Sequence, residues 1–117
     1  WVPAEYVDVV ATEPFLGDPV RRGLRREEVI ERQAALSKLY DGALESISKV
    51  MKKGARCVII FPVLFERRLP LPPSMGRRFN VIEPWKEAFE PRSKRGGLDY
   101  ARPGQHVARE IFVLEKK

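Results

Sequence analysis

The sequence predicts an α/β fold in which one long helix connects two parallel strands. Val7 to Thr12 is an apolar run rich in β-branched residues, and Arg56 to Phe65 contains a second such run. Between them, from Arg26 to Lys53, apolar residues recur every three or four positions, which is the spacing of one helical face. A strand, a helix and a strand in this order form a βαβ unit, whose crossover is right-handed.

Each of these elements has signals at its ends. The first strand is expected to stop at Glu13-Pro14, because proline has no N–H to donate to a ladder. Glutamates in the first turns of the helix and lysines in the last complement the helix dipole, and Gly54 is the expected C′ residue. In the second strand, Pro62 is expected to end regular pairing. Cys57 lies in its apolar core and is expected to be a buried hydrophobe rather than a nucleophile.

The rest of the chain is less regular. Glu66 to Ser74 is a proline-rich connection that is predicted to be irregular. The following residues, Arg77 to Glu90, fit either a short strand or a short helix. Leu98 to Arg102 and Val107 to Glu115 flank a Pro-Gly turn, and they are predicted to form a terminal antiparallel hairpin at the edge of the sheet.

The composition favours a polyanionic partner. The 117 residues include 22 Lys and Arg, 16 Asp and Glu and a single His, which gives a net charge of +6, so nucleic acid is the first expectation. One cysteine excludes an internal disulfide and fits a reducing cytoplasm. No apolar run approaches the ~20 residues of a membrane span, and Trp1 opens no signal peptide. We therefore expect a cytoplasmic chain without a membrane partner, and a start at Trp suggests a piece of a longer product.

Several common catalytic motifs are missing from the sequence. One His and one Cys leave no metal-ligand spacing, so no metal is expected. His106 lies beside a predicted turn and is expected at the surface. There is no GxSxG nucleophile elbow, and neither GxGxxG nor GxxxxGK(S/T) occurs. The sequence therefore favours neither a serine triad nor a self-contained nucleotide-binding loop.

The order of the elements, together with V-M-K-K-G-A-R from Val50 to Arg56, resembles the second half of a class I S-adenosylmethionine-dependent methyltransferase. More narrowly, T-E-P-F-L-G from Thr12 and R-P-G-Q-x-V-x-R-E-I from Arg102 to Ile111 are similar to the RNA methylase group that includes the tRNA guanine-N2 methyltransferases. The resemblance covers Val7 to Leu114, except the proline-rich stretch. It implies that residues 1–117 are the C-terminal half of a Rossmann-like methyltransferase sheet. The N-terminal, cofactor-binding half would be absent, and S-adenosyl-L-methionine would be the cofactor.

In that family a motif of the form (Asp or Asn)-Pro-Pro-(Tyr or Phe) follows the fourth strand, and its positions fall on Thr12, Glu13, Pro14 and Phe15. The resemblance implies that the first residue and the backbone carbonyls accept hydrogen bonds from an exocyclic amine, while Phe15 stacks on the target base. Thr12 replaces the usual Asp or Asn, and Glu13 replaces the first Pro. Glu13 could supply a carboxylate one position later, although neighbouring strand residues point to opposite faces. The cofactor-binding residues are expected mostly on the absent half, and none is assigned in this chain.

Basic residues near the expected site are predicted to contact RNA. The candidates are Arg21, Arg22, Arg25, Arg67, Arg68, Arg77 and Arg78. Because these groups follow strand ends of a βαβ unit, we expect them to emerge near one face and to frame a positive rim. Pro91 to Gly97 adds a third basic segment, which is expected to be flexible.

The predicted function is methyl transfer from S-adenosyl-L-methionine to an exocyclic amine of a base in RNA, with tRNA favoured, together with the missing N-terminal half. The open edge of the strand Val7 to Thr12 is expected to pair with that half or with a second copy of the chain. Two alternatives stay open. One is a basic RNA-binding module that kept the fold and lost the chemistry, and the other is a DNA adenine-N6 methyltransferase.

Overall fold

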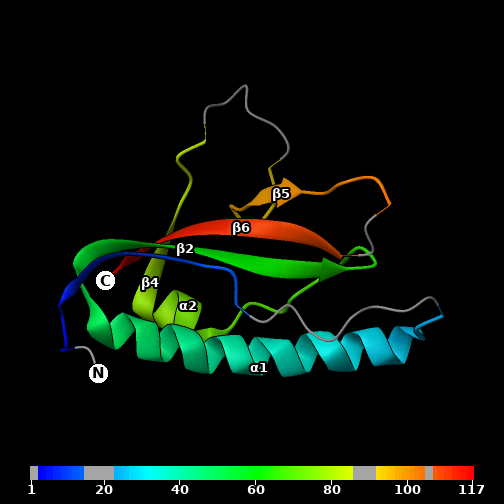
Figure 1. Ribbon diagram of the computed structural model, residues 1–117, viewed down its shortest axis with the longest axis horizontal. Helices are drawn as coiled ribbons and strands as arrows, with labels where there is room; N and C mark the ends of the chain where they lie inside the picture. The colour runs from blue at the N-terminus through cyan, green and yellow to red at the C-terminus, as the bar shows by residue number, and fades with distance from the viewer. Residues whose placement is uncertain (1–2, 15–22, 86–91, 105–106) are drawn as a thin grey trace.

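The structure, a computed structural model, describes residues 3–14, 23–85, 92–104 and 107–117. They form a mixed α/β fold in which α1 and α2 lie together on one side of a twisted sheet (Figure 1). In chain order the elements are β1 (Val7–Thr12), α1 (Arg26–Val50), β2 (Met51–Leu64), β3 (Arg67–Arg68), α2 (Pro73–Arg78), β4 (Phe79–Ile82), β5 (Leu98–Tyr100) and β6 (Val107–Lys116).

The sheet order confirms the predicted parallel pair and terminal hairpin. β1 pairs with β2 in parallel, and β5 pairs with β6 in an antiparallel arrangement. The last strand is not at the edge, however, because β6 lies antiparallel between β2 and β4. Its run of Phe112, Val113 and Leu114 is almost fully buried, as expected of a strand with neighbours on both sides. β1, β2 and β4 therefore run in one direction and end at the same edge of the sheet.

The hydrophobic core lies between the sheet and α1. Cys57, Ile59 and Phe61 alternate along β2, and they pack with Tyr40 and Leu44 of α1 in a cluster from which water is excluded. The rings of Tyr40 and Phe61 meet edge to face, with their centroids 5.4 Å apart. The expectation for Cys57 is confirmed, since its side chain is buried and this burial raises the pKa of its thiol to about 11.

The long helix ends earlier than its pattern predicts. α1 stops at Val50, and the lysines and glycine that follow already belong to β2. The register between β1 and β2 shifts directly after the pair of Val7 and Met51, which leaves an irregular segment in β2. Gly54 has a φ of 78° in this segment, so its left-handed conformation serves a bulge rather than a helix end. No helix in the described part of the chain is long and apolar enough to span a membrane.

Pro62 does not end the second strand. It pairs with Arg109 of β6, and the ladder continues to Leu64. In a β-strand, the N–H and C=O groups of one residue point to the same neighbouring strand. The Pro62 carbonyl points away from β6, because it accepts a hydrogen bond from Gln33 Nε2 of α1 at 3.0 Å. The missing N–H of Pro62 therefore faces α1 and the β3 side, and it costs the β2–β6 ladder no hydrogen bond.

The proline-rich connection is more regular than predicted. It contains the short strand β3, and α2 begins at Pro73, a position where the missing N–H is tolerated. Two contacts tie it to α1, since Ser37 Oγ donates to the Pro70 carbonyl at 2.7 Å and the Ser74 N–H donates to Asp41 Oδ1 at 2.7 Å. The predicted short strand is confirmed, because β4 begins directly after α2. Most of the alternative helix, around Trp85 to Phe89, lies outside the described residues.

Candidate functional site

The predicted motif lies where the parallel strands end. Thr12 is the last residue of β1 and pairs with Ile59 of β2, and Glu13 and Pro14 follow it directly. In open α/β sheets, ligands bind beyond the carboxyl ends of the strands. Phe15, the fourth residue of the motif, lies outside the described residues. The structure thus brings three of the four motif positions to the edge where such sheets bind ligands.

Thr12 and Glu13 point to opposite faces of the sheet. Val10 packs against the core under α1, and Thr12, two residues further along the strand, shares that face. Glu13 instead binds Arg109 of β6, whose Nε donates to Glu13 Oε1 at 2.8 Å. The carboxylate one position later therefore does not replace the acidic group that Thr12 lacks.

Tyr40 of α1 supports the motif from the core side. Its side chain is fully buried, and its hydroxyl donates a hydrogen bond to the Pro14 carbonyl at 3.5 Å. Burial, and secondarily the negative charge of Glu13, raise the pKa of the Tyr40 hydroxyl above its ordinary value. The hydroxyl therefore stays protonated at neutral pH and remains a donor to the motif backbone.

A cavity of about 380 Å³, here called the turn pocket, lies beside the motif. Its lining comes from the turn between β2 and β3 (Phe65 and Glu66), from the end of β5 (Tyr100 and Ala101) and from Arg109 of β6, among others. Arg109 belongs to both places, because the same side chain that lines the pocket also binds Glu13. The motif and the pocket are therefore neighbours at one edge of the sheet.

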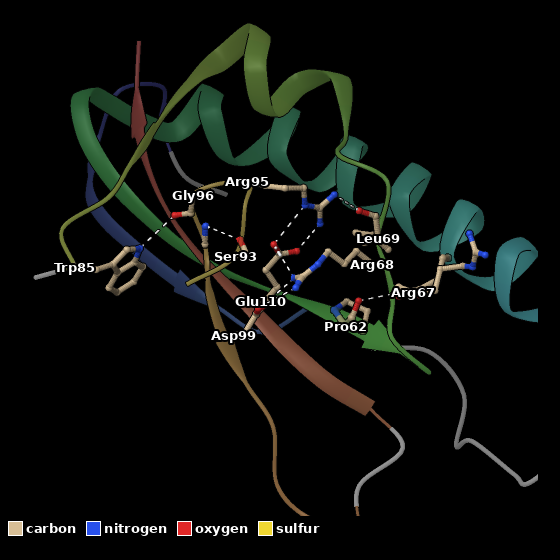
Figure 2. A network of polar contacts seen from close by, with 12 residues as sticks. Pro62, Arg67, Arg68, Leu69, Trp85, Ser93, Arg95, Gly96, Asp99 and Glu110 are labelled. Atoms are coloured by element: carbon tan, nitrogen blue, oxygen red, sulfur yellow. Dashed lines mark hydrogen bonds and ion pairs between the residues drawn. The ribbon is translucent and has the colours of Figure 1, made fainter. Parts of the chain in front are cut away.

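A buried ion network supports the turn pocket (Figure 2). Glu110 is fully buried between two guanidinium groups, with Arg68 Nη1 at 3.0 Å from one carboxylate oxygen and Arg95 bound to the other. Arg68 also donates to both oxygens of Asp99, at 2.7 and 2.8 Å, and Arg95 donates to the Leu69 carbonyl at 2.8 Å. In the described part of the chain, no group of three or more acidic, His or Cys side chains could hold a metal ion.

This network corrects the prediction of a flexible basic segment at Pro91 to Gly97 for its described residues, 92–97. Arg95 is only 23% exposed, because a buried carboxylate such as Glu110 requires cations that lie close to it. Arg68 likewise holds two carboxylates and is part of the framework of the fold. Arg68, one of the predicted RNA contacts, therefore lines the turn pocket, where its main role is to hold the structure together.

The predicted positive rim is divided between the two ends of the sheet. Arg67 and Arg68 lie in β3, close to the carboxyl ends of β1 and β2. Arg77 and Arg78 lie in the last turn of α2, just before β4, and both bind Glu45 of α1, at 3.0 and 2.6 Å. Because β4 runs parallel to β2, the residues before β4 stand at the opposite edge. The expectation of one shared face is therefore wrong for Arg77 and Arg78.

Of the three predicted RNA contacts between β1 and α1, only Arg25 lies within the described residues. Arg25 precedes α1, is 81% exposed and lies 3.8 Å from Glu28. Arg21 and Arg22 lie outside the described residues, as does His106. Their predicted roles remain predictions.

Sequence reasoning missed the turn pocket and Glu110. A signal for Glu110 was present, since it occupies the same inward face as Phe112 in the period-two pattern of β6. An inward-pointing acidic residue in a chain rich in arginine indicates a buried ion pair. Phe65 carries no comparable signal, because Phe-Glu is not a favoured pair for a tight turn.

No family model and no curated protein matches the chain. Among solved structures, it is similar to a protein from Thermus thermophilus that is named as a DNA modification methylase and was crystallised in complex with S-adenosyl-L-methionine. The sequence identity is 20% and the TM-score is 0.46. The match covers 98% of this chain and 47% of that protein, so the chain spans about half its length.

Proposed function

We propose that this chain is the acceptor-binding half of a methyltransferase that modifies an exocyclic amine of a base in RNA, with tRNA as the favoured substrate. The observation that carries this proposal is the position of Thr12, Glu13 and Pro14 at the carboxyl end of β1, beside β2. The sheet order supports it, since β1, β2 and β4 run in one direction and their carboxyl ends meet at the edge that carries the motif.

The motif residues would orient the acceptor. S-adenosyl-L-methionine, when bound, supplies an electrophilic methyl group. Thr12 Oγ and the second lone pair of the Pro14 carbonyl would accept N–H groups of the amine and hold its nitrogen at a near-attack distance of about 3–3.5 Å. Tyr40 donates to that carbonyl from the core side. Phe15 would stack on the base, which contributes roughly 1–3 kcal/mol once the base has left its helix.

The residues present fit only one side of a cofactor site. The motif edge of β1 and β2 can face a cofactor, but the sequence contains neither of the glycine-rich phosphate loops described above. We therefore propose that most cofactor contacts come from a complementary N-terminal half of the same domain.

The sheet offers a surface for such a half. α1 and α2 cover one face of the sheet (Figure 1). Val58, Ile60 and Ile111 alternate with the buried core residues, so they point to the other face, and they are only half-buried. Val9 of β1 is 64% exposed, and among the described residues β1 pairs with β2 alone. Parallel strands are normally covered on both faces, so we propose that the complementary half packs here and pairs with β1. A second copy of the chain is the alternative occupant.

One observation favours a second candidate function, a non-catalytic RNA-binding module. Glu13 is engaged by Arg109 on the face opposite Thr12, which leaves a hydroxyl where the family has an acidic or amide side chain. A hydroxyl is a weaker acceptor for an amine than a carboxylate, so the same fold could bind RNA without methylating it.

The test is calorimetric titration of S-adenosyl-L-methionine into this chain alone and into a mixture with the upstream segment encoded by the same gene. The proposal predicts binding by the mixture only, and methyl transfer by the mixture to tRNA. Phe15→Ala should lower the rate and Phe15→Tyr should preserve it, because only the tyrosine variant keeps a stacking ring. If the mixture neither binds the cofactor nor methylates any nucleic acid, the non-catalytic module is the better description. Transfer to DNA but not to RNA would favour the DNA adenine-N6 alternative.

A further inference from the structure

We propose that the turn pocket binds an unstacked base of the RNA substrate that flanks the methylated base. This inference rests on the proposed function, because it names a second recognition site on the same substrate. It concerns residues to which the motif assigns no role, chiefly Phe65 and Tyr100.

The walls of the pocket suit a flat aromatic ligand. Phe65 and Tyr100 both line it, and each is 42% exposed. The guanidinium group of Arg102 lies over the Tyr100 ring, 5.8 Å from its centroid, so a base would stack on the surface that Arg102 leaves open. Val63 and Ala108 add apolar wall between the two aromatic side chains. A volume of about 380 Å³ is in the range of small-molecule sites, and aromatic side chains stack on every base because each base has a π-face.

The polar groups of the pocket suit the edge of a base. Arg68 and Asp99 both line it and hold each other through two hydrogen bonds, which places donors beside acceptors. Base edges present donors and acceptors side by side in the same way. Because Arg68 is also tied to the buried Glu110, this pair is rigid before any ligand arrives, and little ordering remains to be done on binding.

The backbone of the turn is strained at the aromatic residue. Phe65 and Glu66 have φ values of 47° and 65°, and they form the two-residue connection between the paired residues Leu64 and Arg67. A turn with two consecutive positive φ values favours Asn-Gly. Strained backbone concentrates at ligand sites, and here the strain is accepted at the position that brings a phenylalanine to the pocket.

The Tyr100 wall of the pocket is too far from Thr12 for one base to contact both. Thr12 ends β1, whereas Tyr100 ends β5, and the order β1-β2-β6-β5 separates them by three strand spacings. At ~4.8 Å per spacing this is about 14 Å, which is more than one base can bridge. The Glu13–Arg109 pair stands between the two places. A strand with its acceptor base at the motif would therefore place a neighbouring base in the pocket.

The test compares two ligands on this chain, a short single-stranded RNA and a ribose-phosphate strand of the same length without bases. The double variant Phe65→Asn, Glu66→Gly removes the aromatic ring while installing the favoured turn pair. It should melt at a higher temperature than the wild type and yet bind the RNA roughly tenfold more weakly. Tyr100→Ala should show a similar loss. Tyr6→Ala is the matched control, since Tyr6 is an exposed aromatic residue at the opposite edge, and it should bind the RNA as the wild type does.

The pocket assignment is overturned if the turn variant keeps full affinity for the RNA, or if the baseless strand binds as tightly as the RNA does. Equal loss of affinity for both ligands also overturns it, because this would indicate phosphate binding rather than base binding. These outcomes are separate from failure of the proposed function. A reconstituted protein that methylates nothing would remove the acceptor assignment, while a base-dependent loss in the turn variant would still stand.

Discussion

Replacing Glu110 by glutamine should destabilise the fold more than any other single loss of charge in the ion network. The Glu110 side chain is fully buried, and it is the group on which Arg68 and Arg95 converge. Breaking a buried ion pair by removing one partner costs about 3–5 kcal/mol. Glutamine preserves the volume, so no cavity contributes to the loss.

The exposure of the two arginines places the expected cost at the low end of that range. Arg68 is 36% exposed and keeps Asp99, and Arg95 is 23% exposed and keeps the Leu69 carbonyl. Both guanidinium groups can therefore bind water once the neutral amide of glutamine replaces the Glu110 carboxylate. We expect a loss of about 3 kcal/mol in the free energy of unfolding, a large fraction of the ~5–15 kcal/mol typical of a domain.

Asp99→Asn is the matched control. It also removes one carboxylate from Arg68, but Asp99 is 28% exposed and Arg68 keeps Glu110, so the expected loss is at most about 1 kcal/mol. The assay is urea unfolding followed by far-ultraviolet circular dichroism, with stability taken from the midpoint and the slope. If Glu110→Gln costs no more than Asp99→Asn, the carboxylate does not organise the network and the reasoning is wrong.

Three further predictions concern single side chains. Gly42→Ala should stabilise the chain by about 0.5–1 kcal/mol in the same urea assay, because Gly42 lies inside α1 and an added Cβ meets no atom within 4 Å. Hydrogen bonds from Arg78 and Arg77 lower the pKa of Glu45 to about 2, so its stabilising contribution is complete above the ordinary value of 4.5 and is lost as the pH falls towards about 2. Wild-type stability should therefore decline more steeply over that interval than the stability of Glu45→Gln, and parallel curves would contradict this. Cys57 should react with a thiol reagent only at the rate of unfolding, since it is buried and its pKa is raised to about 11, and fast labelling of the folded chain would refute its burial.

The backbone plan could be predicted because it follows from hydrophobic periodicity. The pattern predicts the βαβ unit, and the structure contains it as β1, α1 and β2. The end of the helix could not be predicted, because a glycine at position 54 indicates a left-handed backbone but not which structural feature requires it. A helix end and a bulge both require this conformation, and only the register between β1 and β2 distinguishes them.

The site was predictable where it depends on chain order and unpredictable where it depends on pairing. Thr12 to Pro14 had to fall at the end of the first strand, and they do. Whether an arginine is held in an ion pair or is available to a ligand depends on a carboxylate that is distant in the sequence. Arg68 and Asp99 are 31 positions apart, and Arg77 and Glu45 are 32 apart, so no local pattern announces either pair.

These pairings change what the net charge of +6 means for RNA binding. Arg68 and Arg95 hold the carboxylate of Glu110 at the edge that carries the motif, so neither is a free contact for phosphate there. At the opposite edge, a hollow is lined by five basic residues, of which two pair with Glu45. The five are Lys49, Arg77, Arg78, Lys116 and Lys117. Phosphate contacts supply affinity and salt dependence, whereas contacts to bases supply specificity. Among the described residues, this basic cluster thus stands at the edge opposite the aromatic residues that would recognise bases. Salt sensitivity alone would therefore say nothing about whether the motif edge has engaged a base.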